Sequence, residues 1–225
     1  SIRDDIMRAM ETIQNQIKCI KFKQRDPETR DYAFLTKKTG CWSFVGRQGG
    51  SQQVSLDSTC FAVGVIIHEL IHVIGFWHEH SRSDRDEYIQ ILWENIIEDQ
   101  KSNFQKFDIW DNNLLGETFD YDSIMMYGLY TFSKDGASQT MKAIQENVTI
   151  LPVSSKVQLS DSDIRRIKKL YECDGMIRPP VPDVPPTKCD FELDYCHMSN
   201  QMDPGLALWK RIRGRMGSLK GDHTT

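Results

Sequence analysis

Three absences limit what this sequence of 225 residues encodes. Positive charge is not in excess: the sequence has 28 Lys and Arg and 32 Asp and Glu, which gives a net charge of −4. Such a composition does not indicate a nucleic-acid-binding protein. No apolar run approaches the ~20 residues that a membrane-spanning helix needs. The chain starts at Ser1 with neither an initiator methionine nor a signal peptide, so we expect a processed or excised piece of a longer protein.

The six cysteines contain no C-x-x-C pair. Cysteine-based zinc sites usually contain such pairs, so their absence argues against a site of that kind and favours disulfides formed in an oxidising compartment. The segment Asn147-Val148-Thr149 is a sequon for N-linked glycosylation, which agrees with that compartment. Both features predict a secreted, extracellular protein.

Histidines are concentrated in one apolar stretch, where four of the six lie between positions 68 and 80. The valines, isoleucines and leucines around them predict a buried helix over residues 62–75. On such a helix His68 and His72 lie one turn apart, so both imidazoles project from the same face. Neutral imidazoles are zinc ligands, and the adjacent Glu69 does not need to be one.

Gly75 extends this pattern, because glycine adopts a positive φ at no steric cost and so ends a helix abruptly. The reversal of the chain would bring His78 back as a third ligand. Three protein ligands leave a fourth position open for water, which is typical of a catalytic rather than a structural zinc site. The alternative is a buried helix that carries histidines by chance, but three unpaired histidines in an apolar environment would be costly.

Two separated segments resemble the motifs of a known family. Residues 68–86 resemble the long zinc signature of the astacin metalloendopeptidases, which belong to the metzincins, and residues 123–128 resemble the methionine turn after which metzincins are named. The resemblance covers residues 2–174. It implies an α+β, two-lobed metzincin or zincin fold, in which a mixed twisted sheet accompanies a zinc helix and a C-terminal helix, with zinc in the cleft between the lobes.

The resemblance also implies roles for single residues. His68, His72 and His78 would hold one Zn²⁺, which lowers the pKa of its bound water from ~16 towards ~7. Glu69 would be the general base that takes the proton of this water. Tyr127 would be a retractable zinc ligand whose hydroxyl stabilises the oxyanion of the transition state.

These roles predict a secreted zinc-dependent metalloendopeptidase that hydrolyses peptide bonds in peptide or protein substrates. One alternative is a zinc-binding pseudo-protease that acts as an extracellular adhesion or interaction module. Such a protein would be expected to have lost Glu69 or a histidine, and neither is lost. A second alternative treats the chain as a structural module whose functional part is its C-terminal end.

Three further residues near these motifs carry expectations. By resemblance, Met125 would lie beneath the zinc as an apolar floor. Met126 stands where the family usually has histidine, and we expect this change to alter packing near the turn rather than to abolish catalysis. Glu79 has two interpretations: the resemblance implies a buried contact with the mature N-terminus, and the alternative is an ion pair with Arg82 or Arg85.

The resemblance implies covalent and terminal features as well. It suggests disulfides between Cys19 and Cys173 and between Cys41 and Cys60. It also implies a strand and a buried mature N-terminus ahead of the first helix, and these are not among the 225 residues. We therefore expect the N-terminal strand of the catalytic domain to be missing.

Periodicity predicts the other elements of the first 174 residues. Isoleucines and Met10 at spacings of three and four predict an amphipathic helix over residues 2–17. Residues 86–107 should combine a short extended piece with a helix, and residues 108–157 should be mostly irregular and hold the substrate-facing turns. Alternating patterns predict four strands, at residues 19–23, 32–36, 42–46 and 54–56.

The last predicted helix of this part begins at a capping box formed by Ser160 and Asp163. Its spacing gives it a buried face and a solvated basic face. The expected buried residues are Ile164, Ile167 and Tyr171. The expected solvated residues are Arg165, Arg166, Lys168 and Lys169.

Composition changes after residue 174, and the sequence predicts three parts. Residues 1–174 would be the astacin-like catalytic domain, and residues 175–188 a proline-rich, semi-rigid linker. Residues 189–225 resemble the start of a MAM domain, an extracellular β-sandwich module of adhesion and oligomerisation, in a meprin-like arrangement. The resemblance suggests a bridge between Cys189 and Cys196, and a complete MAM domain would allow oligomerisation. His197 and His223 would then not be ligands.

Overall fold

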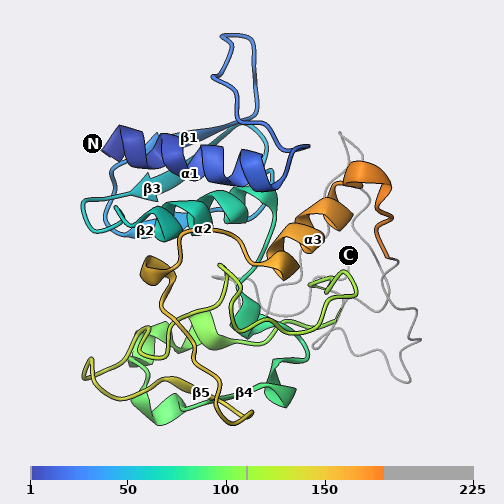
Figure 1. Ribbon diagram of the computed structural model, residues 1–225. Helices are drawn as coiled ribbons and strands as arrows, with labels where there is room; N and C mark the ends of the chain where they lie inside the picture. The colour runs from blue at the N-terminus through green and yellow to red at the C-terminus, as the bar shows by residue number, and fades with distance from the viewer. Residues whose placement is uncertain (1, 110, 180–225) are drawn as a thin grey trace, which may run out of the picture. The chain divides into compact units, whose positions relative to one another are not determined.

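The computed structural model describes residues 2–109 and 111–179, which lie in one compact unit, Ser1–Pro180. Most of the predicted linker and the whole MAM-like segment lie outside the described residues. Figure 1 shows two lobes within the unit. The upper lobe contains the three α-helices of the described residues and a sheet of three strands. The lower lobe, residues 76–159, contains mostly irregular chain, short 3₁₀ helices and a sheet of two short strands.

Helix α1, Ile2–Gln16, confirms the predicted amphipathic helix. Ala9, Ile13 and Ile17 are completely buried, and the helix packs against α2. The strand predicted at residues 19–23 is wrong, since this segment pairs with no strand. The Phe22 amide donates instead to the side-chain oxygen of Gln14, which takes the place of a partner strand. An alternating pattern alone cannot show whether a second strand lies alongside.

The upper sheet is mixed, as predicted, and has the order β1-β3-β2. β1, Tyr32–Thr36, runs parallel to β3, Ser51–Leu56, and β2, Cys41–Ser43, runs antiparallel to β3. The prediction for β1 is confirmed, whereas β2 ends earlier and β3 begins earlier than predicted. The disulfide between Cys41 and Cys60 is present as predicted and ties β2 to the segment after β3.

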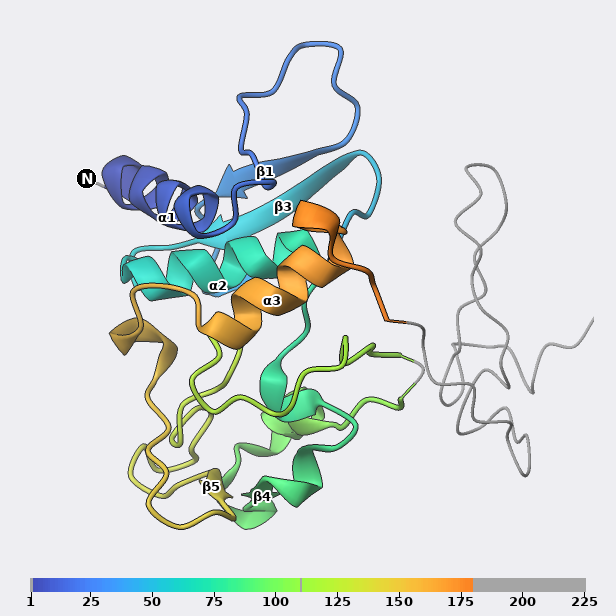
Figure 2. The same cartoon turned by 45° about the vertical axis from the view of Figure 1, so that its right-hand side comes forward.

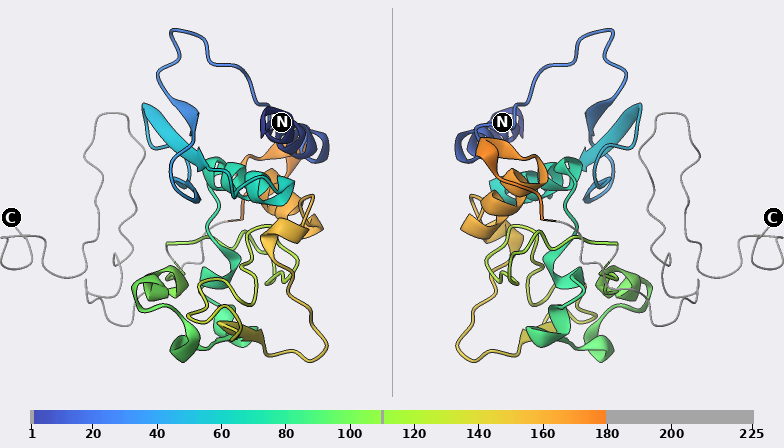
Figure 3. Two further views of the ribbon diagram at one scale, coloured as in Figure 1. Left: turned by 90° about the vertical axis from the view of Figure 1, so that its left-hand side faces the viewer. Right: turned by 90° about the vertical axis from the view of Figure 1, so that its right-hand side faces the viewer.

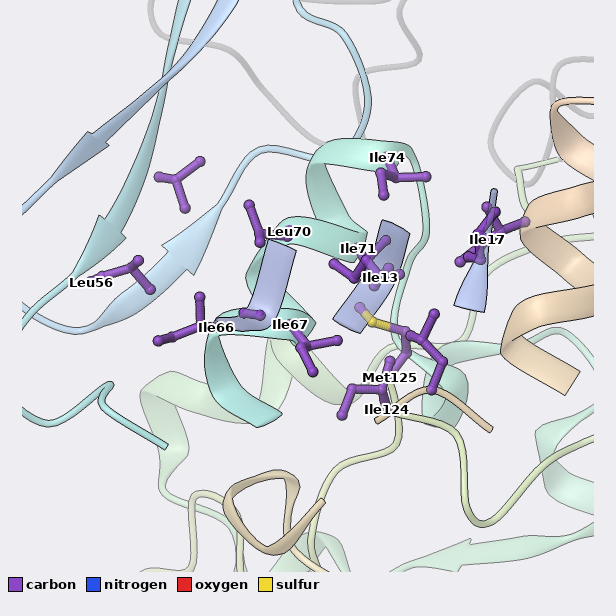
Figure 4. Packing of buried hydrophobic residues seen from close by; sticks show 14 of the residues in the cluster. Ile13, Ile17, Leu56, Ile66, Ile67, Leu70, Ile71, Ile74, Ile124 and Met125 are labelled. Atoms are coloured by element: carbon purple, nitrogen blue, oxygen red, sulfur yellow. The ribbon is translucent and has the colours of Figure 1, made fainter. Parts of the chain in front are cut away.

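Helix α2, Val63–Ile74, is the predicted zinc helix and lies at the centre of the molecule. The two side views of Figure 3 show it between the upper sheet and the lower lobe. Gly64 permits a close approach there, because a Cβ at this position would lie 2.0 Å from the carbonyl oxygen of Lys156. In Figure 4, Ile124 and Met125 reach from the lower lobe to Ile67 and Ile71 of α2.

The lower lobe has its own hydrophobic cluster with little regular structure around it. β4, Ile89–Ile91, pairs antiparallel with β5, Met141–Ala143. The helix predicted within residues 86–107 is a 3₁₀ helix, Glu98–Phe104, rather than an α-helix. Residues 108–157 are mostly irregular as predicted, apart from β5. The cluster contains Ile89, Ile91, Ile96, Phe104, Phe119, Met126, Met141 and Ile150.

Helix α3, Asp161–Leu170, lies beside α2 in Figure 2. It begins at the predicted capping box of Ser160 and Asp163. Two predictions about its faces are wrong: Tyr171 is 49% exposed, and Arg166 is only 6% exposed. Tyr171 lies at the rim because its hydroxyl donates to the carbonyl of Ile74, and Arg166 is buried because it has an anionic partner in the lower lobe.

The predicted disulfide between Cys19 and Cys173 joins the end of α1 to the segment after α3. None of the helices in residues 2–109 and 111–179 is long and apolar enough to cross a membrane.

Candidate active site

Three histidines converge where α2 ends. His68 and His72 project from one face of α2, and Gly75 ends the helix with a φ of 117° while its N–H donates to the carbonyl of His72. The chain then turns and brings His78 back. Its Nε2 lies 3.2 Å from Nε2 of His68 and 3.1 Å from Nε2 of His72. The predicted role of Gly75 is confirmed.

The spacing of the three Nε2 atoms fits a zinc ion. Ligand nitrogens at ~2.0–2.1 Å from a tetrahedral zinc are separated by roughly 3.3–3.4 Å, close to the distances found here. A second group of potential ligands among the described residues consists of Cys41, Asp57 and Cys60. Its two cysteines form a disulfide, so that group has no thiolate to offer.

Backbone carbonyls orient two of the three rings. Nδ1 of His68 lies 2.8 Å from the carbonyl oxygen of Ile124, and Nδ1 of His72 lies 2.7 Å from that of Phe76. An imidazole that donates from Nδ1 has its lone pair on Nε2, the atom that faces the site. Burial lowers the pKa of His68 to about 3 and that of His72 to about 4, so both rings are neutral and able to bind a metal.

Glu69 lies next to the first histidine and is 4% exposed. Its Oε2 has no hydrogen-bond partner among the described residues. Burial raises the pKa of this carboxyl to about 8. A buried carboxyl without a partner is unfavourable for the fold, and such groups are typical of functional sites.

Tyr127 lies against the third histidine. Its ring centroid is 4.4 Å from that of His78 and 4.0 Å from that of His80, on which it stacks. Burial, together with the nearby charge of Glu69, raises the pKa of the Tyr127 phenol, so this phenol is protonated at neutral pH. A protonated hydroxyl is a hydrogen-bond donor.

The methionine turn separates the two lobes' clusters. Met125 is buried with the upper cluster around α2, and its carbonyl accepts the N–H of Glu79. Met126 is fully buried in the lower cluster. An apolar side chain at this position therefore packs among apolar side chains of the lower lobe.

Glu79 has a partner that the sequence did not indicate. Arg166 of α3 binds both carboxylate oxygens, with an Nη2 to Oε1 distance of 2.8 Å. The predicted contact with Arg82 is confirmed at 3.4 Å, whereas Arg85 instead donates to the carbonyls of His80 and Phe104. The spacing of the last helix predicts a solvated Arg166. This prediction is wrong because helical spacing cannot reveal an anion 87 positions away.

Other residues of the site were also missed by sequence reasoning. His80 is completely buried and donates from Nε2 to the carbonyl of Asn103, while its ring supports Tyr127. Lys156 is buried and donates to the carbonyl of Ser123 in the methionine turn. Asp163 was recognised only as a helix cap. For His80, the one available sequence signal was its place among four histidines within 13 positions.

Comparison with families and solved structures agrees with this geometry. The profile of the peptidase family described as Astacin matches residues 1–172. High choriolytic enzyme 1, a hatching enzyme zinc-protease from Oryzias latipes, aligns with a TM-score of 0.69 at 39% identity, over 76% of this chain and 83% of that one. Myroilysin aligns with a TM-score of 0.50 at 18% identity, over 76% and 86%, which shows likeness of fold alone.

Sequence relatives cover most of this chain but less of their own length. Zinc metalloproteinase nas-4 from Caenorhabditis elegans is 43% identical over 166 residues, which are 70% of this chain and 50% of the relative. Nas-6 from the same organism is 44% identical over 155 residues, 69% and 44% of the two chains. Tolloid-like protein 2 from Homo sapiens is 41% identical over 157 residues, 69% and 16%. This chain thus spans half or less of these relatives.

Fold and site together define a zinc metalloprotease domain with the two-lobed α+β architecture that was predicted, and His68, His72 and His78 form the site for one zinc. The chain belongs to the astacin family of metalloproteases.

Proposed function

We propose that this chain is a zinc-dependent endopeptidase in which Glu69 is the general base. The observation that carries the proposal is the position of Glu69: it is buried, it has no partner for Oε2, and it directly follows a zinc ligand. When bound, zinc supplies a Lewis acid that polarises a peptide carbonyl and makes a water molecule acidic.

Glu69 would move the proton of the reaction. Burial raises the pKa of this carboxyl, which makes its carboxylate a stronger base than an exposed one. It would take the proton of the attacking water and return it to the leaving amine. Its lack of a competing donor among the described residues keeps Oε2 free for this exchange.

Tyr127 would stabilise the charge that develops on the carbonyl oxygen. Its raised pKa keeps the phenol protonated, and stacking on His80 holds its ring beside His78. A fixed hydroxyl donor of this kind acts mainly in the transition state, when the oxygen becomes anionic.

We propose that peptide substrates lie along β2. This strand is at an edge of the upper sheet, so one side of its backbone has no strand partner among the described residues. It is also close to the metal site, since the amide of Gly46, shortly after β2, donates to the carbonyl of His72. An extended peptide that pairs with such an edge gains main-chain hydrogen bonds irrespective of its sequence, which suits a protease.

We further propose that the protein is secreted and glycosylated. Two disulfides join distant segments of the described chain, which supports an oxidising compartment. Asn147 and Thr149 of the sequon are exposed on the lower lobe, where a glycan would meet no packed surface.

For the domain organisation we propose a catalytic domain at residues 1–174, a linker at 175–188 and the start of a MAM domain at 189–225, through which the complete protein would oligomerise. The last of these parts lies outside the described residues. A version that ends at Asp174 keeps both described disulfides. It should cleave peptides as fast per folded molecule as the full chain, and loss of activity on truncation would contradict the division.

One experiment separates the endopeptidase from a zinc-binding pseudo-protease that acts as an interaction module. Cleavage of a mixed peptide library is measured for the protein, for Glu69→Gln, and for the exposed control Glu11→Gln. An endopeptidase cleaves, is inhibited by a zinc chelator, and loses on the order of 10²–10⁴-fold in rate in Glu69→Gln while retaining its zinc. Zinc-loaded protein that cleaves nothing would refute the proposal in favour of the pseudo-protease.

A further inference from the structure

Two side chains of α3 bind the backbone and side chains next to zinc ligands. Asp163 and Arg166 lie three positions apart and therefore on the same face of the helix. Both are buried, whereas the flanking Asp161 and Arg165 are exposed. Figures 1 and 2 show α3 beside α2, which carries two of the histidines.

Asp163 reaches His68 through one residue, Ile124. Its Oδ2 accepts the N–H of Ile124 at 2.8 Å, and its Oδ1 accepts the hydroxyl of Ser123 at 2.6 Å. The carbonyl of the same Ile124 lies 2.8 Å from Nδ1 of His68. Displacement of Ile124 would therefore tilt the ring of His68 or leave its Nδ1 without an acceptor.

Arg166 acts in the same way near His78. It binds both carboxylate oxygens of Glu79, the residue directly after His78, and it also donates to the carbonyl of Thr118 at 2.9 Å. The backbone N–H of Glu79 in turn donates to the carbonyl of Met125 at 2.9 Å. Glu79 is thus held at its side chain and at its backbone, which fixes the course of the chain at His78.

We propose that Asp163 and Arg166 are positioning residues of the zinc site, which act through Ile124 on His68 and through Glu79 on His78. One face of α3 then positions two of the three ligands. It does so through two other chain segments, one at Ile124 and one at Glu79. The proposal concerns metal binding and does not depend on the proposed peptidase activity. Removal of the groups that orient a zinc ligand typically weakens metal binding about 10–100-fold.

The test compares Asp163→Asn with Asp161→Asn and Arg166→Met with Arg165→Met. Each pair removes the same charge from neighbouring positions of α3, so effects on the helix dipole are nearly matched. Zinc affinity is measured by competition with a fluorescent chelator, well below the melting temperature of every variant. We expect about 10–100-fold weaker zinc binding for Asp163→Asn and Arg166→Met. The two variants of exposed residues should bind zinc as the original protein does.

A third control separates positioning from general loss of stability. Ile167→Ala removes apolar contacts of a fully buried residue on the same helix and touches none of these polar contacts. It should lower the melting temperature and leave zinc affinity unchanged. Equal weakening of zinc binding in Ile167→Ala, or unchanged binding in both test variants, would overturn the proposal.

Milder substitutions decide the matter if the first variants do not fold. Ser123→Ala removes one donor to Asp163, and Arg166→Lys retains the charge but loses the paired geometry. Both should weaken zinc binding less than the larger changes but measurably, and unchanged affinity in both would overturn the proposal. In zinc-free protein, the amide of Ile124 should also exchange its hydrogen faster in Ser123→Ala than in Asp161→Asn.

Discussion

Residues 2–75 and residues 76–159 both surround the zinc histidines, yet different interactions hold the two regions together. The first region consists of two helices and a sheet whose apolar side chains meet in one cluster. The spacing of these side chains follows the helix and strand periods, so local pattern and packing agree. Its members include Ile13, Ile17, Ile66, Ile67, Leu70 and Ile71.

The second region relies on buried cations to a much greater degree. Arg82 is 2% exposed and binds Asp84 as well as the carbonyl of Glu117, while Arg85 donates to the carbonyls of His80 and Phe104. Irregular chain leaves many backbone carbonyls without ladder partners, and a guanidinium with its five donors satisfies several of them at once.

This difference corresponds to what each region contributes. The helix of the first region supplies His68 and His72 in a geometry that depends on helical spacing. The second region supplies His78 and Tyr127 from chain whose course depends on side chains far apart in sequence. We therefore expect loss of an α2 histidine to act directly on the metal, and substitutions of lower-lobe residues other than His78 to act through the course of the chain or on rate.

The largest effect should follow loss of a ligand from α2. In His72→Ala only two histidines remain, so zinc should fall from one per molecule to a small fraction on purification. Elemental analysis measures this directly. His223→Ala is the control, since the sequence predicts that this histidine is not a ligand. Undiminished zinc in His72→Ala would mean that the three histidines are not the metal site.

Arg82→Met tests the dependence of the lower lobe on buried cations. Loss of the guanidinium leaves Asp84 and the carbonyl of Glu117 without this donor and removes the contact with the buried carboxylate of Glu79. We therefore expect a loss of about 3–5 kcal/mol in the free energy of unfolding. Lys101→Met, in a solvent-accessible pair with Glu98, should change it by no more than about 1 kcal/mol. Denaturant melts measure both, and an equal small loss in the two variants would show that buried cations are dispensable there.

Tyr127→Phe sharpens the contrast between metal and rate. The ring, and with it the stacking on His80, is retained, so zinc content and melting temperature should be unchanged. The turnover rate should fall by about 10²-fold, the scale of one lost oxyanion donor. Tyr130→Phe, at an exposed tyrosine three residues on, should have no effect. Unchanged turnover in Tyr127→Phe would eliminate its proposed role, and loss of zinc would make it a structural ligand.

The smallest effect concerns a turn of the upper lobe. The hydroxyl of Thr59 and the amides of Gly40 and Thr59 donate to Asp57 and lower the pKa of its carboxyl. A lowered pKa stabilises the fold above the unfolded value near 3.8, and this contribution is lost as the pH falls through the lower folded value.

Asp57→Asn should therefore be less stable than the original protein at neutral pH, and the difference in melting temperature should shrink as the pH falls below about 4. Asp99→Asn, at an exposed position of the lower lobe, should show no such trend. A difference that stays constant down to acidic pH would contradict the link between this carboxylate and stability.

Sequence reasoning succeeded where neighbouring residues decide the structure. The helix of residues 63–74, its end at Gly75, the ligand role of three histidines and the capping box of Ser160 and Asp163 all follow from contacts within a few positions. It failed at residues 19–23, where the sequence alternates but the segment pairs with no strand. It also failed at Arg166, which lies among basic residues of α3 and is nevertheless buried.

The sequence by itself determined which atoms meet the metal, because the 3.6-residue period and a glycine at a positive φ place His68, His72 and His78 through local geometry. Only the tertiary structure decided what holds those atoms in place. Ile124 orients His68 across 56 positions, and Arg166 neutralises Glu79 across 87. Such contacts form only when two lobes close around α2, since no local pattern specifies which distant partner a buried polar group will find.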